Sequence, residues 1–160
     1  MKILFLDIDG VLLPGRAYML PYQTKPIVKE FDPCAVSMIN TVLSDDAVDA
    51  KIAIHSSWLR HWTEADGESV RHHMIEQGIE GRHFHDDPEC LGSMHWRYDR
   101  IDEWLYRHKE IEDFVVLDDE PCSPDWPRKD HLILTDFDEG ITMNNYRELF
   151  RRLRKDTDVG

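Results

Sequence analysis

Residues 2–13 read KILFLDIDGVLL, and this stretch decides the fold. Lys2–Leu6 is almost entirely apolar, which is typical of a strand that is buried on both faces of a parallel sheet. Asp7, Asp9 and Gly10 follow it directly, at the position where open α/β sheets hold their ligands. Gly10 allows the backbone to turn sharply away from the sheet. Taken alone, this short motif fits an Asp-rich turn as well as it fits a site.

The length and composition favour one globular domain over residues 1–160. No apolar run is long enough to span a bilayer, and the N-terminus does not read as a signal peptide. The three cysteines are odd in number and scattered, which favours reduced thiols and a cytoplasmic location. We therefore expect no membrane association.

The formal net charge of −13 opposes a large nucleic-acid groove, because phosphate backbones attract basic surfaces. The same charge is compatible with a local basic pocket for a single phosphate. It is also compatible with an acidic site that binds a divalent cation.

Two further apolar strands end in polar residues. Lys51–His55 runs into Ser56 and Ser57, and Asp113–Leu117 runs into Asp118 and Asp119. Shorter strands are predicted at 81–85 and 131–134, with an irregular stretch at 86–94, and helices are predicted to start at 33, 67, 96 and 142. This alternation predicts an α/β fold, a doubly wound parallel sheet in a three-layer α/β/α arrangement.

The polar ends of the three buried strands should meet at one edge of that sheet. Four carboxylates would gather there, those of Asp7, Asp9, Asp118 and Asp119. They would repel one another unless a cation lay among them. Oxygen ligands favour a hard ion, and Mg²⁺ is the usual choice where phosphate shares its coordination. The Ser56 hydroxyl, with either Arg97 or Arg100, could then hold phosphate oxygens.

This set of motifs resembles the haloacid dehalogenase (HAD) superfamily of phosphatases. DIDGV at 7–11, Ser56 after its strand, Arg97 ahead of the last motif, and VVLDD at 115–119 stand in the order of the four HAD motifs. DIDGVLLP, HSSWLR, RYDRIDEWL and VVLDDE together are similar to the small HAD domains of "Swiss Army Knife" RNA-repair proteins. The resemblance implies a HAD-like Rossmannoid fold.

The resemblance also implies roles for individual residues. Asp7 would be the nucleophile that forms an aspartyl-phosphate, and Asp9 the general acid and base. Asp119 would bind Mg²⁺ with Asp7, with Asp118 beside it, and Asp9 would contribute its backbone carbonyl. The remaining expected phosphate-binding residues are Ser56, the Ser57 backbone, Arg97 and Gly10.

Little sequence lies between the motifs, so we expect a capless or minimally capped enzyme. A flap at about 14–31 carries Arg16, Lys25, Lys29, Tyr18 and Tyr22. It fits either a solvated surface loop or a segment that contacts an anionic substrate. We expect the substrate to be a phosphorylated small molecule or a nucleic-acid end.

Two alternatives remain open. The chain could be a HAD-like binding or regulatory module without turnover, although such a module would often lack the acid at Asp9. His72-His73 and the pair His83 and His85 invite a zinc interpretation. Because no cysteine or third ligand accompanies them in the sequence, we expect surface or edge histidines instead.

Overall fold

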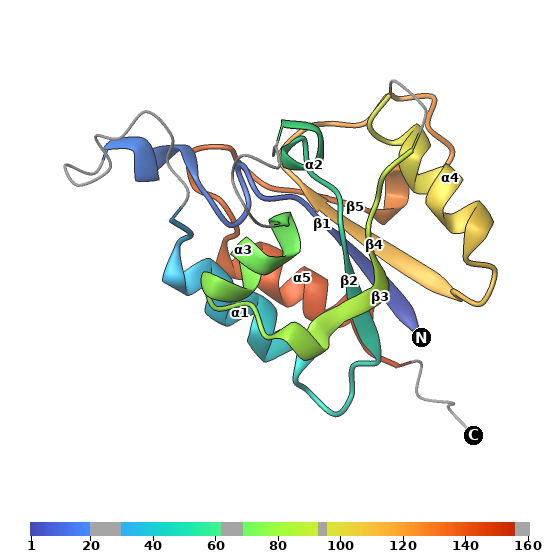
Figure 1. Ribbon diagram of the computed structural model, residues 1–160, viewed down its shortest axis with the longest axis horizontal. Helices are drawn as coiled ribbons and strands as arrows, with labels where there is room; N and C mark the ends of the chain where they lie inside the picture. Colours follow the sequence, from blue (N-terminus) through green and yellow to red (C-terminus); the bar gives the residue numbers. More distant parts are fainter. Residues whose placement is uncertain (20–29, 62–68, 93–95, 156–160) are drawn as a thin grey trace.

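The computed structural model describes residues 1–19, 30–61, 69–92 and 96–155. At its centre is a five-stranded sheet in which all neighbouring strands are parallel (Figure 1). The strands, in their spatial order, are β3 (Phe84–Glu89), β2 (Ala50–Ile54), β1 (Lys2–Leu6), β4 (Asp113–Asp118) and β5 (Leu132–Leu134). The strand that opens the chain is therefore the middle strand, as its continuous apolar run predicts.

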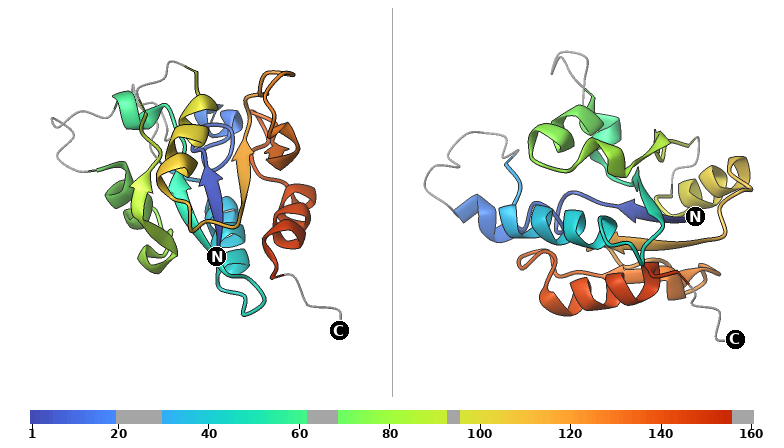
Figure 2. Two further views of the ribbon diagram at one scale, coloured as in Figure 1. Left: turned by 90° about the vertical axis from the view of Figure 1, so that its right-hand side faces the viewer. Right: turned by 90° about the horizontal axis from the view of Figure 1, so that it is seen from below.

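Helices cover both faces of the sheet (Figure 2). On one face lie α1 (Pro33–Leu43), α3 (Val70–Glu76) and α5 (Met143–Leu153), and on the other lies α4 (Asp99–Arg107). The predicted three-layer α/β/α arrangement is confirmed. The shorter helices are η1 (Gly15–Met19), α2 (Trp58–His61), η3 (Gly81–His83) and η4 (Lys129–His131).

Alternate residues of β1 supply the two cores. Leu4 and Leu6 belong to the aliphatic core under α1 and α5, whereas Ile3 and Phe5 belong to the core under α4. The α4 core is rich in aromatic rings, and Phe5 packs edge to face on Trp104 at 5.3 Å. Since successive strand residues point to opposite faces, one apolar strand can anchor both layers.

The predicted helix starts at Asp32-Pro33 and at Thr142 are confirmed. Asp32 caps α1 by accepting a hydrogen bond from the Cys34 backbone N–H at 2.9 Å. Thr142 and Asn145 form a capping box at the start of α5. Local sequence decides both starts, because each cap bonds within three residues of itself.

The prediction of the edge strand was wrong in its bounds. Gly81–His83 is a short 3₁₀ helix, and the strand runs over Phe84–Glu89, through residues predicted to be irregular. Its sequence, FHDDPE, has no alternating apolar pattern. Parallel pairing with β2, with a shift of register between Ile52 and Ile54, makes it a strand.

Two predicted helices begin later than expected. The helix predicted from Trp96 begins at Asp99, and the Arg97 carbonyl accepts a hydrogen bond from His55, outside the helix. The helix predicted from Gly67 begins at Val70 with Ser69 as its cap. It stops before Gly78, as predicted, and the backbone there has a φ of 104°.

The predicted flap at 14–31 contains η1, and its remainder includes residues 20–29, which hold Tyr22, Lys25 and Lys29 and lie outside the described residues. Within the described ranges, the segments after β1 and β2 contain the helices η1, α1, α2 and α3 and no second sheet. None of the described helices has the length and apolar character needed to cross a membrane.

Candidate active site

The carboxyl ends of β1, β2 and β4 bring together the polar residues that follow them. Leu6 pairs with Ile54 on one side and with Leu117 on the other, so Asp7, His55 and Asp118 come next in register. The Asp7 backbone N–H donates to the Leu117 carbonyl at 3.1 Å. The sheet register thus places Asp7 between the other two strand ends.

Three carboxylates converge at this edge. Candidate ligand oxygens of Asp7, Asp118 and Asp119 all lie within 4.8 Å of one another. Asp7 is 1% exposed and Asp118 is fully buried. Asp7 Oδ1 and Asp118 Oδ2 have no well-oriented hydrogen bond among the described residues. Buried carboxylate oxygens without such bonds are a favourable environment for a hard cation, so the residues present fit Mg²⁺.

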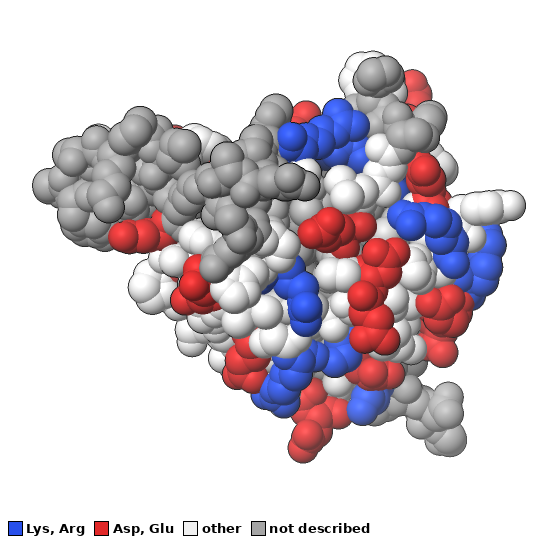
Figure 3. Space-filling model, in the orientation of Figure 1, with Lys and Arg blue, Asp and Glu red and all other residues white. Residues whose placement is uncertain are grey.

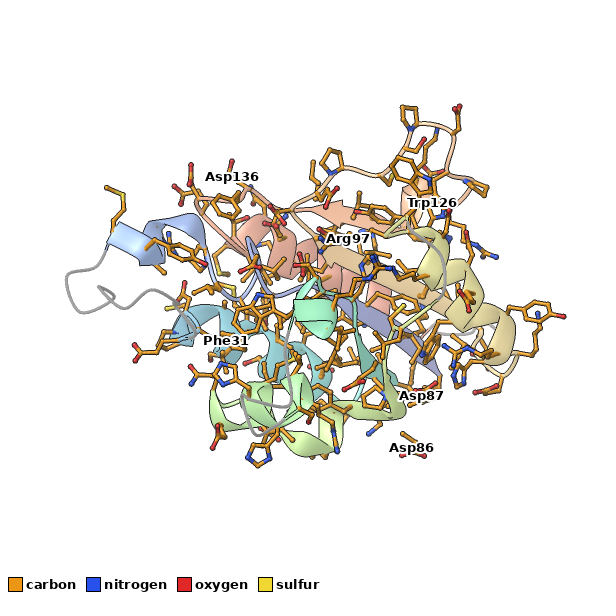
Figure 4. The ribbon with its side chains drawn as sticks, turned by 45° about the horizontal axis from the view of Figure 1, so that its top comes forward. Phe31, Asp86, Asp87, Arg97, Trp126 and Asp136 are labelled. Carbon is orange, nitrogen blue, oxygen red and sulfur yellow. The ribbon has the colours of Figure 1, made fainter. Side chains whose placement is uncertain are left out.

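Arg97 is the cation that the structure places against these carboxylates (Figure 4). Its guanidinium pairs with Asp7, with Asp118 at 2.9 Å from Nε to Oδ2, and with Glu120 at 3.1 Å. Arg100 lies in the first turn of α4, near Arg60 and Cys90. Of the two arginines left open by the sequence, Arg97 therefore contacts the acids.

Burial controls the charge of the cluster. It raises the pKa of Asp7 and of Asp118, and the neighbouring carboxylates raise both values further. Arg97 lowers both values, but it does not outweigh burial. One guanidinium therefore does not stabilise all of the negative charge that these acids can carry, and a second cation would.

Asp9 lies at the rim of the cluster. Its Oδ2 accepts a hydrogen bond from the Trp58 ring N–H at 2.8 Å. Burial raises the pKa of Asp9, while Trp58 and Arg97 lower it. A carboxyl group whose pKa is raised and whose position is fixed by a hydrogen bond is suited to proton transfer.

Gly10 turns the chain beneath Asp119. Its φ is 67°, and a Cβ atom added there would lie 2.6 Å from Asp119 Cβ. The Gly10 carbonyl accepts a hydrogen bond from the buried Thr135 hydroxyl at 2.7 Å. Any larger residue at this position would displace Asp119 from the cluster.

The two serines differ in their surroundings. Ser56 is buried, its hydroxyl accepts from the Trp58 backbone N–H, and it lowers the pKa of Asp7. Ser57 is exposed, and its carbonyl accepts from the Arg60 N–H at 3.0 Å. The structure thus brings Ser56 to the carboxylates and leaves Ser57 at the surface beside them.

Sequence reasoning missed several residues that shape the site. His55 lies between the carboxylates and the core, its Nε2–H donates to the Arg97 carbonyl at 2.9 Å, and burial lowers its pKa to about 4. Three further residues form hydrogen bonds to residues of the site: Trp58 to Asp9, Glu120 to Arg97, and Thr135 to Gly10. A histidine at the end of an otherwise apolar strand was the available signal for His55.

Comparisons with known proteins agree with this geometry. Residues 3–146 match the family described as "HAD domain in Swiss Army Knife RNA repair proteins". No curated protein and no solved structure matches the chain. HAD domains are a phosphatase-type hydrolase family. Because the match covers most of the sequence, the chain belongs to the HAD domain family of Swiss Army Knife RNA repair proteins.

Proposed function

We propose that this protein is a Mg²⁺-dependent phosphomonoesterase that works through an aspartyl-phosphate on Asp7. The observation that carries the proposal is the convergence of Asp7, Asp118 and Asp119 with Arg97 at one edge of the sheet. Asp9, fixed by Trp58, lies at the same edge. A nucleophile, an acid and a charged phosphate site are the parts that this chemistry needs.

Asp7, Asp119 and the Asp9 backbone carbonyl would hold the metal, with Asp118 beside them. Bound Mg²⁺ would neutralise phosphate charge and favour the ionised form of Asp7. Ser56, the Ser57 backbone and Gly10 would cradle the phosphoryl group. Arg97 carries five N–H donors, so it can bond to a phosphoryl oxygen while it still contacts Asp118.

The reaction would proceed in two displacements. A carboxylate oxygen of Asp7 attacks phosphorus, the bond to the leaving oxygen breaks, and Asp9 gives that oxygen its proton. Water then attacks phosphorus, Asp9 accepts the proton from the water, and the bond to Asp7 breaks to release phosphate. The raised pKa of Asp9 suits both proton transfers.

The substrate would be a nucleotide or a nucleic-acid end. Tyr18 is 49% exposed and lies near enough to Asp9 that this carboxylate raises the pKa of Tyr18, after burial. A ring beside the leaving group can stack on a base. On the face shown in Figure 3, the described Lys and Arg side chains are interspersed with carboxylates, which opposes a long polynucleotide groove.

The location would be cytoplasmic, because Cys34, Cys90 and Cys122 are free thiols in the structure.

Three other residues of the flap, Tyr22, Lys25 and Lys29, lie outside the described residues. Tyr18 is therefore the flap residue through which the substrate proposal can be tested. Arg16 pairs with Asp32 and Glu139 instead of facing the site.

The experiment is a hydrolysis assay with p-nitrophenyl phosphate, with and without Mg²⁺. We expect turnover that requires the metal, and phosphate label on the protein that hydroxylamine removes, as it does from an acyl phosphate. A panel should favour nucleoside monophosphates and phosphorylated oligonucleotides over sugar phosphates, and Tyr18→Ala should reduce that preference. If Mg²⁺ binds but no divalent ion supports turnover, the result would favour a catalytically silent HAD-like binding module.

A further inference from the structure

A second group of possible metal ligands lies away from the carboxyl edge of the sheet. It comprises His85 on β3, His108 at the end of α4, and Glu110 just beyond it, with candidate ligand atoms all within 4.8 Å of one another. Figure 4 shows the neighbouring Asp87 well apart from Arg97. The two groups lie at opposite ends of α4, a helix of nine residues and thus about 13 Å long.

The ring of His108 lies between two carboxylates. Its Nε2 lies 2.9 Å from Asp87 Oδ2, and its Nδ1 lies 3.1 Å from Glu110 Oε1. An imidazolium can donate to both carboxylates, whereas a neutral imidazole has one N–H and can donate to only one of them. When Nε2–H donates to Asp87, the lone pair of Nδ1 faces Glu110, and a metal ion between them would bind both.

His85 can present a second nitrogen to the same position. Its Nδ1 accepts a hydrogen bond from the Asp87 backbone N–H at 3.1 Å and lies 3.4 Å from the Asp87 carbonyl oxygen. Metal binding at Nε2 would require the ring proton to move to Nδ1. In the metal-binding tautomer, Nδ1–H donates to that carbonyl. Ligating histidines usually donate their other N–H to a carbonyl or carboxylate, and the Asp87 carbonyl and carboxylate are the acceptors within reach of His85 and His108.

The two imidazoles are held in place by the buried Trp104. His108 stacks on the Trp104 ring at 3.9 Å between centroids, and His85 meets it edge-on at 5.2 Å. His108 is also the C-cap residue of α4, at the end where the helix dipole favours a positive charge. The core therefore orients the two histidines before any ion binds.

We propose that His85, His108 and Glu110 form a Zn²⁺ site, with Asp87 as a positioning residue. Two imidazole nitrogens and one carboxylate suit Zn²⁺, whereas Mg²⁺ prefers oxygen ligands alone. The Glu110 side chain is 60% exposed, so water completes the coordination. The ion links the end of α4 to β3. Because β3 is an edge strand that pairs with β2 alone, this link stabilises its attachment to the protein.

This site could not be recognised in the sequence. His83, the apparent partner of His85, lies near Ser44 and Glu80 instead. The ligands that accompany His85 come from another element, more than twenty residues later in the chain.

The test is a Zn²⁺ titration of the chelator-stripped full chain, in competition with a chromophoric chelator and in saturating Mg²⁺. We expect one bound Zn²⁺ whose affinity falls at least about tenfold in His85→Gln, in His108→Gln and in Glu110→Gln. His72→Gln replaces an exposed histidine elsewhere and should leave the affinity unchanged. Co²⁺ bound in place of Zn²⁺ should give visible absorption that the three variants lose.

Glu110→Gln is the decisive variant, because this exposed residue can change without disturbing the core; circular dichroism checks the fold of each variant. Unchanged Zn²⁺ affinity in Glu110→Gln and His85→Gln would overturn the proposal. Loss of the Zn²⁺ in Asp119→Asn, with binding intact in Glu110→Gln, would overturn it too by placing the ion at the carboxyl edge. Neither result depends on phosphatase activity, so failure of the proposed function would be seen separately.

Discussion

Two ionic clusters in this molecule have similar contacts and opposite surroundings. Arg97 meets Asp118 at 2.9 Å inside the carboxyl edge, whereas Arg151 and Arg152 meet Glu148 at 2.7 and 2.6 Å on the surface of α5. The arginines on α5 lower the pKa of Glu148 to about 2. Arg97 has the same tendency, yet the pKa of Asp118 is raised.

The difference teaches that burial, not the presence of an ion pair, decides the charge state of a carboxylate here. Water solvates Glu148, so its arginines only need to outweigh a small desolvation effect. Asp7 and Asp118 have lost that solvation, and one guanidinium does not replace it. We therefore expect changes in the buried cluster to affect both activity and stability, and changes in the surface cluster to affect neither strongly.

The largest expected effect is that of Asp7→Asn. An amide has nearly the same shape as the carboxylate but is a poor nucleophile, so kcat should fall by at least about 10⁴-fold while the fold persists. Steady-state kinetics and circular dichroism would measure this. Glu148→Gln makes the same chemical change in the surface cluster and serves as the control. Wild-type kcat in Asp7→Asn would rule out the covalent mechanism.

Asp9→Asn should cause the next largest loss of activity, and the size of this loss should depend on the substrate. Proton transfer contributes about 10²- to 10⁴-fold, and alkyl phosphates need it more than p-nitrophenyl phosphate does, because their leaving oxygen is more basic. Comparing kcat/KM for the two substrates tests the role of Asp9. An equal loss on both would argue against the acid. Trp58→Phe, which removes the bond to Asp9, should show a weaker form of the same pattern.

Arg97→Met removes the cation of the buried cluster and leaves the proposed nucleophile, Asp7, unsubstituted. It leaves Asp7 and Asp118 without their guanidinium, and removing one partner of a buried pair costs about 3–5 kcal/mol. Urea denaturation in EDTA would measure the loss of unfolding free energy. Arg97→Lys keeps the charge and should lose less. Wild-type stability in Arg97→Met would show that these carboxylates are protonated at neutral pH.

Mg²⁺ should raise the thermal stability of the wild-type protein. A ligand that binds only the folded state stabilises it by about 2.7 kcal/mol at a concentration 100 times its Kd. Melting curves in EDTA and in Mg²⁺ measure this, and Asp119→Asn should reduce the shift. Identical melting temperatures for the wild-type protein in the two solutions would count against a metal site at Asp7 and Asp119.

The smallest expected effect is that of Glu148→Gln on stability. An exposed pair contributes less than about 1 kcal/mol. Because the folded-state pKa is lowered from 4.5 to about 2, this contribution is present above pH 4.5 and is lost as the pH falls toward 2. Urea denaturation of both proteins at pH 7 and pH 3 should show a difference that shrinks at the lower pH. A difference that grows on acidification would contradict the stabilisation of ionised Glu148 by the two arginines.

The sequence by itself determined the centre of the fold and most of the candidate cluster. The apolar runs before Asp7 and Asp118 predict buried strands, and parallel strands present their carboxyl ends at one edge. The caps at Asp32 and Thr142 were readable because their hydrogen bonds are local. The roles given to the site residues stay predictions.

Tertiary structure alone decided which residues from distant elements meet. Edge strand β3 exists because its backbone pairs with β2, which its polar sequence does not signal. Arg97 pairs with Asp7 and Asp118 from a position just before α4, where its carbonyl accepts a hydrogen bond from His55, the residue after β2. His85 meets His108 only because α4 runs back across the sheet to the side of β3. The hydrophobic periodicity of a sequence indicates which face of a helix or strand is buried. These contacts depend instead on where each helix or strand ends, and packing between elements decides those ends.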